Sequence, residues 1–302
     1  MIPIIDPVDR TLILKELTAD KLLRKTNNGG NEIYVVTARN SPNIMQELGR
    51  LRELSFRDAG GGTGATVDID AEDTAEEGYQ QLFVWDPKAQ EIVGGYRFIV
   101  SRTPHPKHMS TEHYFRFSDK FRNEFLPYTI ELGRSFVQPL YQGIRQNPKG
   151  LYSLDNLWDG LGALVVNNPD MRYFFGKVTM YGSYDKEARN ILLYFLRKYF
   201  PDREHLVESI HPIELHFDEE RFERMFCGGS YAEDYKILIR EIRKYRENIP
   251  PLINSYMSLS PSMKVFGTVV NPDFGYVEET GILITISDIY PKKSQRHFRF
   301  DR

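Results

Sequence analysis

The chain has 302 residues and a formal net charge of −3 at pH 7, with 41% hydrophobic and 27% charged residues. This composition is typical of a folded globular protein, and the charge argues against nucleic-acid binding, because such domains are usually strongly basic. The one cysteine, Cys227, cannot form an intramolecular disulfide, so a reducing cytoplasmic compartment is expected. Neither a signal peptide nor a membrane span of about 18 apolar residues is predicted.

The first sixty residues predict a helix, a strand and a second helix. The spacing at 12–23 indicates a helix, and β-branched and aromatic residues at 32–38 indicate a strand. Ser41 followed by Pro42 is a typical helix start. Apolar residues then recur at helical spacing as far as Arg57.

Two loops and a group of strands come next. The glycine-rich stretch 60–64 has no Lys-Ser/Thr after it, which excludes a P-loop for phosphate. The acidic stretch 68–77 is predicted to be a solvated loop. A β-hairpin at 81–86 and 91–100 and a further strand at 128–137 follow.

The second half alternates helices and strands. It predicts an amphipathic helix at 154–167, a short strand at 177–181 and a helix at 183–200 that is capped by Ser183. A highly charged helical insertion outside the core is predicted at 217–249, and two final strands are predicted at 264–270 and 281–286. We therefore expect one α/β domain over 1–302, with a mixed, mostly antiparallel central sheet flanked by helices.

The stretch from 128 to 154 is the candidate site. A strand, a loop with glycine and lysine, and a helix N-terminus form an arrangement that favours an anion, since backbone N–H groups and the helix dipole both point at it. Glu131 and Arg134 lie on opposite faces of the strand unless a bulge intervenes. An ordinary β-loop-α connection, with an exposed Glu131–Arg134 ion pair, explains the same residues equally well.

Four stretches carry a family pattern. They are the helix 51–57, the "V-G-x-x-R" strand 92–98, the "E-x-G-R-S-x-V-x-P" segment 131–139, and the helix and strand within 154–200. In these stretches the sequence resembles the ornithine and glycine lipid N-acyltransferases, also called hemolysin-like, of the GNAT superfamily. It is more distantly similar to acyl-homoserine-lactone synthases.

This resemblance implies a GNAT-like fold and a role in aminolipid biosynthesis. The reaction it implies is the transfer of a fatty acyl group, with or without a 3-hydroxyl, to the amine of an amino acid. It implies no metal and no tightly bound cofactor. The acyl donor is acyl carrier protein or acyl-CoA. The usual GNAT pyrophosphate loop is only approximated here, which favours the carrier protein. The candidate donor-binding residues are Val137, Gly143, Arg145, Lys149 and Gly150; Arg145 and Lys149 are chosen because a basic surface suits an acidic carrier protein.

The chemistry of amide formation indicates candidate residues on the acceptor side. Glu131 accepts a proton from the amine or holds the ammonium, and N–H groups of 131–137 stabilise the oxyanion. Arg134, with Arg52 and Arg97, orders the acceptor carboxylate or the acidic loop. The remaining substrate-binding residues are Phe56 and Ser135. For each arginine, an exposed ion pair of little energetic value is the alternative.

Other functions fit parts of the same pattern. The nearest is a lactone-forming signal synthase that uses S-adenosylmethionine. A non-catalytic hemolysin-like binding protein, a membrane-lytic toxin and a small-molecule acetyltransferase are further alternatives. The basic, aromatic segment 292–300 has a pattern that can touch anionic lipid, which would make the protein peripheral to a membrane; a solvated tail explains it as well.

Overall fold

The computed structural model describes residues 1–142, 150, 152–215 and 218–299. Its centre is an eight-stranded sheet, flanked by a small two-stranded sheet. In spatial order, the strands of the large sheet are β1 (Leu22–Lys25), β2 (Glu32–Val36), β3 (Gln80–Asp86), β4 (Glu91–Ser101), β6 (Thr129–Val137), β7 (Tyr173–Met180), β10 (Val277–Thr285) and β9 (Lys264–Asn271). The small sheet pairs β5 (Phe115–Phe117) with β8 (Val207–Ser209).

Every neighbouring pair in the large sheet is antiparallel except β6 and β7, which run parallel. The described helices are α1 (Arg10–Glu16), α2 (Pro42–Asp58), α3 (Ala71–Thr74), α4 (Ser153–Asn167), α5 (Lys186–Tyr199), α6 (Glu219–Met225), α7 (Tyr231–Arg243), α8 (Pro251–Met257) and α9 (Pro291–His297). The expected α/β class, with a mixed central sheet flanked by helices, is confirmed.

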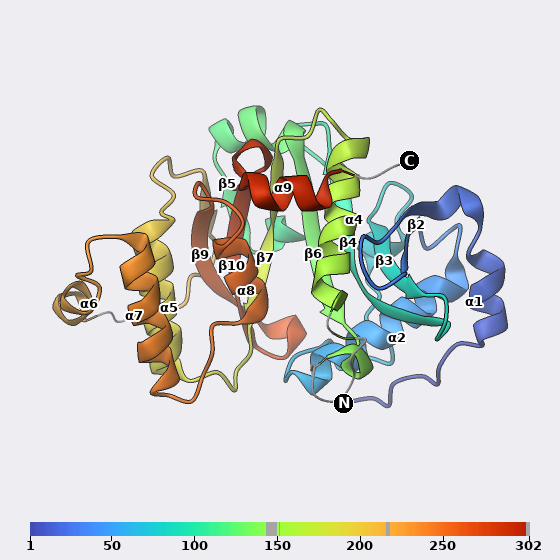
Figure 1. Cartoon of the computed structure of the whole chain (residues 1–302), viewed down its shortest axis with the longest axis horizontal. Coiled ribbons are helices and arrows are strands. Elements are labelled where there is room, and N and C mark those ends of the chain that lie inside the picture. Colours follow the sequence, from blue (N-terminus) through green and yellow to red (C-terminus); the bar gives the residue numbers. More distant parts are fainter. Residues whose placement is uncertain (143–149, 151, 216–217, 300–302) are drawn as a thin grey trace.

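Helices cover both faces of the sheet (Figure 1). α4, α5 and α8 pack on one face, where side chains of β4, β6, β7 and β10 join the largest core cluster. On the opposite face, α1 and α2 cover the N-terminal strands. The small sheet and the segment before β6 cover the remaining strands of that face. Side chains alternate between the two faces along the regular parts of the strands, as the pleat requires.

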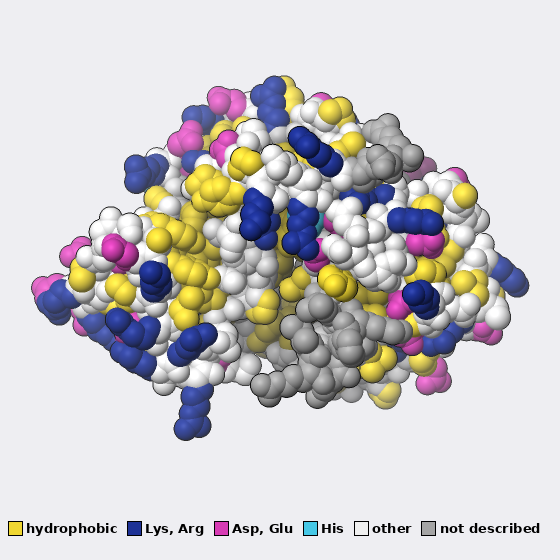
Figure 2. Space-filling model, viewed as in Figure 1, with side chains coloured by type: hydrophobic (Ala, Val, Ile, Leu, Met, Phe, Trp, Pro, Cys, Tyr) yellow, Lys and Arg dark blue, Asp and Glu magenta, His cyan; other side chains and the backbone are white. Residues whose placement is uncertain are grey.

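The C-terminal helix α9 packs beside α4. His297 is 3% exposed, and its Nδ1 lies 2.8 Å from Oδ1 of Asp159 on α4. Lys292 and Lys293 are exposed on α9, and Figure 2 shows basic side chains standing out around this helix. The apolar side of the C-terminal segment therefore faces the core while its lysines face solvent.

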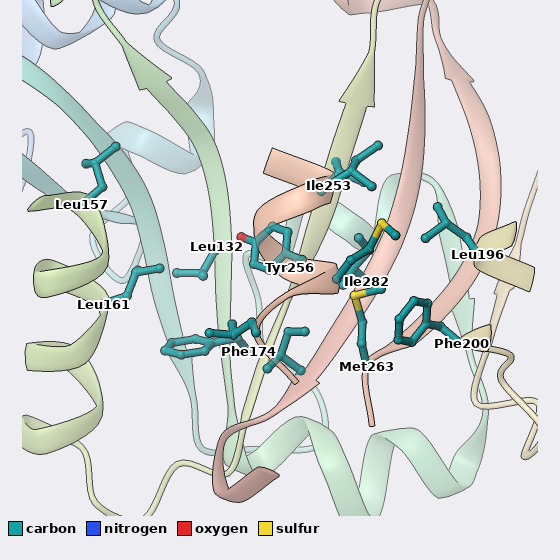
Figure 3. Packing of buried hydrophobic residues seen from close by; sticks show 14 of the residues in the cluster. Leu132, Leu157, Leu161, Phe174, Leu196, Phe200, Ile253, Tyr256, Met263 and Ile282 are labelled. Atoms are coloured by element: carbon teal, nitrogen blue, oxygen red, sulfur yellow. The ribbon is translucent and has the colours of Figure 1, made fainter. Parts of the chain in front are cut away.

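Aliphatic and aromatic side chains fill the core beneath α8. Ile253 and Tyr256 of α8 point toward the sheet, and Tyr256 lies between Leu132 and Ile282 in the view of Figure 3. Leu157 on α4 faces the same space. This region is where β6 and β7 separate, so its packing bears on the site described below.

Two local expectations were wrong. The segment 12–23 is not one helix, because α1 ends at Glu16 and Leu22–Lys25 pairs with β2 as strand β1; sheet pairing overrides helical spacing there. The helix α5 is capped by Asp185, whose carboxylate accepts hydrogen bonds from the backbone of the first turn, and not by Ser183. A carboxylate at this position also suits the helix dipole.

The segment 217–249 contains α6 and α7, but the expectation that it lies outside the core is wrong. Phe222 and Phe226 of α6 and Leu238 and Ile242 of α7 are buried in the largest core cluster. α7 packs along α5. Because this segment is highly charged, its narrow apolar stripe was not recognised in the sequence. That stripe is enough to bury one side of each helix.

Candidate active site

The site lies where the parallel strands β6 and β7 part. They pair only from Thr129 with Tyr173 to Leu132 with Gly176. Beyond that point, β6 continues against β4 and β7 continues against β10. A pocket of about 30 Å³ opens in the gap, and its lining residues are Tyr96, Leu132, Gly133, Arg134, Ser135, Phe174, Phe175, Gly176, Lys177, Val178, Leu252, Tyr256, Ile282 and Ile284.

The pocket passes through the sheet. Lys177 and Val178 are neighbours on β7 and so point to opposite faces, yet both line the pocket. On the face of α2 the pocket is polar, with Arg134 and Lys177 in its wall. On the face of α8 its wall is apolar and includes Leu252 and other aliphatic side chains. The wall of this one pocket is thus basic on one face of the sheet and apolar on the other.

A β-bulge brings Arg134 onto the face of Glu131. The β4–β6 register shifts between Gly95 and Arg97, so Arg134 and Ser135 together oppose one residue of β4. Arg134 has φ 49°, in the left-handed region. The sequence alone placed the two charged residues on opposite faces unless a bulge intervened, and the bulge is present.

Arg134 is held by two aspartates and a ring. Its Nε lies 2.9 Å from Oδ2 of Asp68 and its Nη2 lies 3.7 Å from Oδ2 of Asp70. The guanidinium lies over the ring of Phe274, 4.5 Å from its centroid. Phe56 packs edge-on against that ring at 5.0 Å. Phe56 therefore packs against Phe274, whose ring lies under the Arg134 guanidinium, and Phe56 is not in the pocket wall.

Two further arginines are buried behind Arg134. Nη1 of Arg97 lies 2.6 Å from Asp70 and 3.3 Å from Asp73, and its guanidinium lies 4.4 Å from the centroid of the Tyr79 ring. Nη1 of Arg52 lies 3.2 Å from Asp73. Burial by itself raises the pKa of Asp73, but the two guanidiniums hold it well below its usual range. Arg52, Arg97 and Asp73 thus form a buried network with both signs present, as buried ions require.

The prediction of a solvated loop at 68–77 was therefore wrong. Asp68 and Asp73 are 0% and 2% exposed. Gly49 allows the close approach, because a Cβ there would lie 2.6 Å from the Ile69 side chain. A signal was present in the sequence, because arginines expected inside a core helix and strand need carboxylates beside them. Asp68, Asp70 and Asp73 are these carboxylates.

Glu131 is fully buried, and only one of its oxygens is bonded. Oε1 accepts hydrogen bonds from Ser110 Oγ and from the Thr111 backbone N–H, both at 3.0 Å. Oε2 has no hydrogen-bond partner among the described residues. Burial raises the pKa of this carboxyl; the nearby hydroxyls of Tyr79 and Ser110 and the charge of Arg97 oppose the shift only in part. Glu131 is not in the pocket wall.

Lys177 faces the pocket from β7 and was not among the predicted site residues. Its Nζ lies 2.8 Å from Oε2 of Glu279 and 3.8 Å from the centroid of the Tyr114 ring. Burial lowers the pKa of the Lys177 ammonium; pairing with Glu279 opposes that shift and the charge of Arg134 adds to it. A lysine in a strand of otherwise apolar residues was the available signal.

The other predicted residues divide into two groups. Ser135 lines the pocket, and Val137 lies at the end of β6, partly buried against the core cluster under α4. Gly150 lies against the Tyr141 carbonyl, where a Cβ would come within 2.5 Å of the oxygen. The remaining donor-side residues, Gly143, Arg145 and Lys149, lie outside the described residues.

Over the part of the chain that the structure describes, no group of three or more His, Cys, Asp or Glu side chains is arranged to hold a metal ion. Within the same residues, no helix is both long and apolar enough to cross a membrane. At the split sheet, the described residues offer ionised side chains of both signs, a hydroxyl and backbone N–H groups.

Comparison with known proteins places the chain among acyltransferases. Residues 51–148 match the family described as the acetyltransferase (GNAT) domain. The chain is 54% identical to a glycine N(alpha)-acyltransferase of Bacteroides thetaiotaomicron, over 98% of this chain and 89% of that protein. It is 53% identical to a glycine N(alpha)-acyltransferase of Phocaeicola vulgatus, over 97% of this chain and 92% of that protein.

Among solved structures, a CoA-dependent acyl-homoserine lactone synthase, BjaI, aligns over 88% of this chain and 87% of its own, with a TM-score of 0.35 and 10% identity. A second structure of the same synthase has a TM-score of 0.31 over 50% of this chain and 68% of its own, with 14% identity. Scores this low support no inference about the present chain.

Proposed function

The chain belongs to the family of these two bacterial acyltransferases and is a GNAT N-acyltransferase. From that premise, we propose that it transfers a fatty acyl group from a carrier thioester to the amine of glycine. The choice of glycine rests on the names of two relatives that match nearly the whole chain. The product is an N-acyl amino acid, which we propose serves in aminolipid biosynthesis.

The pocket through the sheet is the observation that supports a fatty acyl donor. Its apolar wall, formed by Leu132, Val178, Leu252 and neighbouring residues, suits a hydrocarbon chain. Its polar wall suits an amino acid, which carries charge at both ends. The bond between acyl carbon and amine nitrogen would then form in the gap between β6 and β7, where the polar and apolar walls of the pocket meet.

The proposed reaction needs no covalent enzyme intermediate. The ammonium first loses a proton to Glu131 through a water molecule, because the unpartnered Oε2 is buried and its raised pKa suits a base. The amine nitrogen then attacks the thioester carbonyl carbon, the carbon–sulfur bond breaks, and the second amine proton leaves with the thiol. N–H groups of β6 beyond Leu132, which have no strand beside them on the β7 side, stabilise the oxyanion.

Arg134 has a different proposed role from the other arginines. It lines the pocket and is the one of the three that can touch the acceptor directly. Arg52 and Arg97 act through Asp73 and Asp70, which fix the acidic segment around Arg134. Arg52 and Arg97 are thus proposed as positioning residues.

The proposed donor is acyl carrier protein, with acyl-CoA as the alternative. Carrier proteins are acidic, and the basic pair Arg145 and Lys149, between β6 and α4, is proposed to receive one. Salt screens such contacts. The Michaelis constant for the carrier-bound donor should therefore rise with ionic strength more steeply than that for a CoA donor of the same chain length.

We further propose that the protein works in the cytoplasm and touches the membrane surface through α9. The exposed lysines Lys292 and Lys293 support this, since each basic residue near an anionic surface contributes about 1 kcal/mol. An apolar product leaving the enzyme would be delivered to that surface.

The function is tested with purified protein, a series of acyl carrier protein and CoA thioesters from two carbons upward, and glycine, with mass spectrometry of the products. N-acylglycine formed faster from long-chain than from acetyl donors supports the proposal. Other amino acids and S-adenosylmethionine serve as competing acceptors. Acetylation without long-chain transfer, or a lactone product from S-adenosylmethionine, would contradict it.

A further inference from the structure

Two cations face each other across the opening between β6 and β7. Arg134 comes from β6 and Lys177 from β7, and both line the same pocket of about 30 Å³. The mutual repulsion is felt at Lys177, because the charge of Arg134 helps to lower its pKa. Two like charges at one small buried pocket repel each other, and carboxylates beside them lower the free-energy cost.

Each cation is fixed from behind by its own carboxylate and its own ring. Asp68 lies 2.9 Å from Arg134 and Glu279 lies 2.8 Å from Lys177. The rings that support them are Phe274 and Tyr114, at 4.5 Å and 3.8 Å. Asn271 donates a further hydrogen bond to Glu279 at 3.1 Å. Both cations are therefore held in place before any ligand arrives, which lowers the entropic cost of binding one.

We propose that Lys177 and Arg134 together bind the α-carboxylate of the amino-acid acceptor, so that the enzyme requires an amine that carries a carboxylate. This rests on the proposed N-acyltransferase function and assigns the acceptor class at the same site. The planar guanidinium and the compact ammonium approach the carboxylate from the two sides of the split. The acceptor amine then points toward the gap where the thioester carbonyl must lie.

A phosphate of the acyl donor has the same charge and is the other source of an anion here. The acceptor is favoured because the cations lie in the gap itself, beside residues of the apolar wall such as Val178. A donor whose acyl chain enters that wall would bring its thioester, and not its phosphate, to this point.

The test compares glycine with glycinamide, in which the carboxylate is replaced by a neutral amide, at saturating donor. In the wild-type enzyme kcat/KM should be far higher for glycine. Lys177→Met should lower kcat/KM for glycine by about 10²-fold, the order expected when one partner of a buried charge contact is removed, and should change that for glycinamide little. The matched control is Lys198→Met: this lysine also pairs with a carboxylate, Asp234 at 2.7 Å, but lies outside the pocket wall.

The double variant Lys177→Met/Glu279→Gln removes both charges of the pair, so that a loss of folding from one unpaired buried charge does not hide the result. An unchanged ratio of glycine to glycinamide in a folded variant would overturn the proposal. So would a raised KM for the donor with an unaltered KM for glycine, which would assign the cations to a donor phosphate. If the wild-type enzyme acylates a different amino acid, the choice of glycine fails, and the carboxylate site is tested with that amino acid and its amide.

Discussion

At the scale of single residues, Glu131 combines features that rarely occur together. It is 0% exposed, one oxygen is satisfied by Ser110 and Thr111, and the other is unpartnered among the residues described. An unsatisfied buried oxygen costs about 1–3 kcal/mol, and such costs are commonly kept where function requires them. Its distance from the pocket wall makes a water relay the simplest connection to the amine.

Replacing Glu131 by Gln tests the proposed proton transfer. The amide keeps an oxygen for Ser110 and Thr111 but cannot accept a proton, so kcat should fall by about 10²–10⁴-fold. Steady-state rates with glycine are compared with those of Glu278→Gln, a control that alters another carboxylate with an unpartnered oxygen, paired with Arg189 outside the pocket. A folded Glu131→Gln enzyme with a normal rate would return Glu131 to a purely structural role.

The same substitution predicts a change in pH dependence of stability. Because burial raises the pKa of Glu131 in the folded state above the ordinary value of 4.5, the native state binds more protons than the unfolded chain. Its contribution is therefore fully present below pH 4.5 and is lost as pH rises through the folded pKa. Denaturant unfolding from pH 4 to 8 should show Glu131→Gln gaining stability relative to wild type as pH rises. A constant difference across this range would mean that Glu131 is not destabilised by burial.

At the scale of elements, β6 sets the site through two local features. Its bulge at Arg134 and Ser135 puts the arginine on the face of the acidic segment. Gly133 leaves room for the side chain of Arg97, since a Cβ there would lie 3.3 Å from Nε of Arg97. The short helix α8 then closes the apolar side of the split through Leu252 and Tyr256.

The volume under α8 predicts how acyl length is read. A space of about 30 Å³ holds roughly two water molecules, so a long chain must displace side chains of α8. Leu252→Trp should lower kcat/KM for long-chain donors at least about 10-fold more than for acetyl donors. Leu154→Trp, at an exposed leucine of α4 that is not in the pocket wall, is the control. Equal losses for all chain lengths would place the acyl chain elsewhere.

At the scale of the whole molecule, one sheet joins the N-terminal strands under α2 to the C-terminal strands under α5 (Figure 1). Its two faces bury separate clusters, yet strands β4 and β6 contribute to both of the larger ones. We propose that residues 1–302 form a single domain on this basis, since neither half could keep its sheet edge satisfied alone.

A single domain predicts one cooperative unfolding transition. The two tryptophans report on different regions: Trp85 lies in the cluster under α2, and Trp158 packs against the cluster under α4. Each of the variants Trp85→Phe and Trp158→Phe keeps one tryptophan. Within each variant, the denaturation curve followed by fluorescence should coincide with the curve followed by far-ultraviolet circular dichroism. Two separated midpoints within one variant would divide the chain into independent units.

The sequence by itself determined much about this protein, because local patterns report local structure. Period-two and helical spacings identified the hairpin β3–β4, the strand β6 and the helices α2 and α4. The resemblance carried by the motif at 131–139 and three other stretches pointed to an N-acyltransferase, and it placed the candidate site at the strand β6. These features depend on residues close together in the chain, so one sequence is enough to read them.

Only the tertiary structure decided which charges share a site. Asp68 and Asp73 lie far in sequence from Arg134 and Lys177, and locally they showed only an acidic stretch, as Lys177 showed only a lone lysine in a strand. Their burial follows from sheet pairing and from the need of each buried arginine or lysine for a carboxylate. The bulge that turns Arg134 was equally undetermined, because a one-residue shift in register against β4 reverses a side chain and depends on both strands.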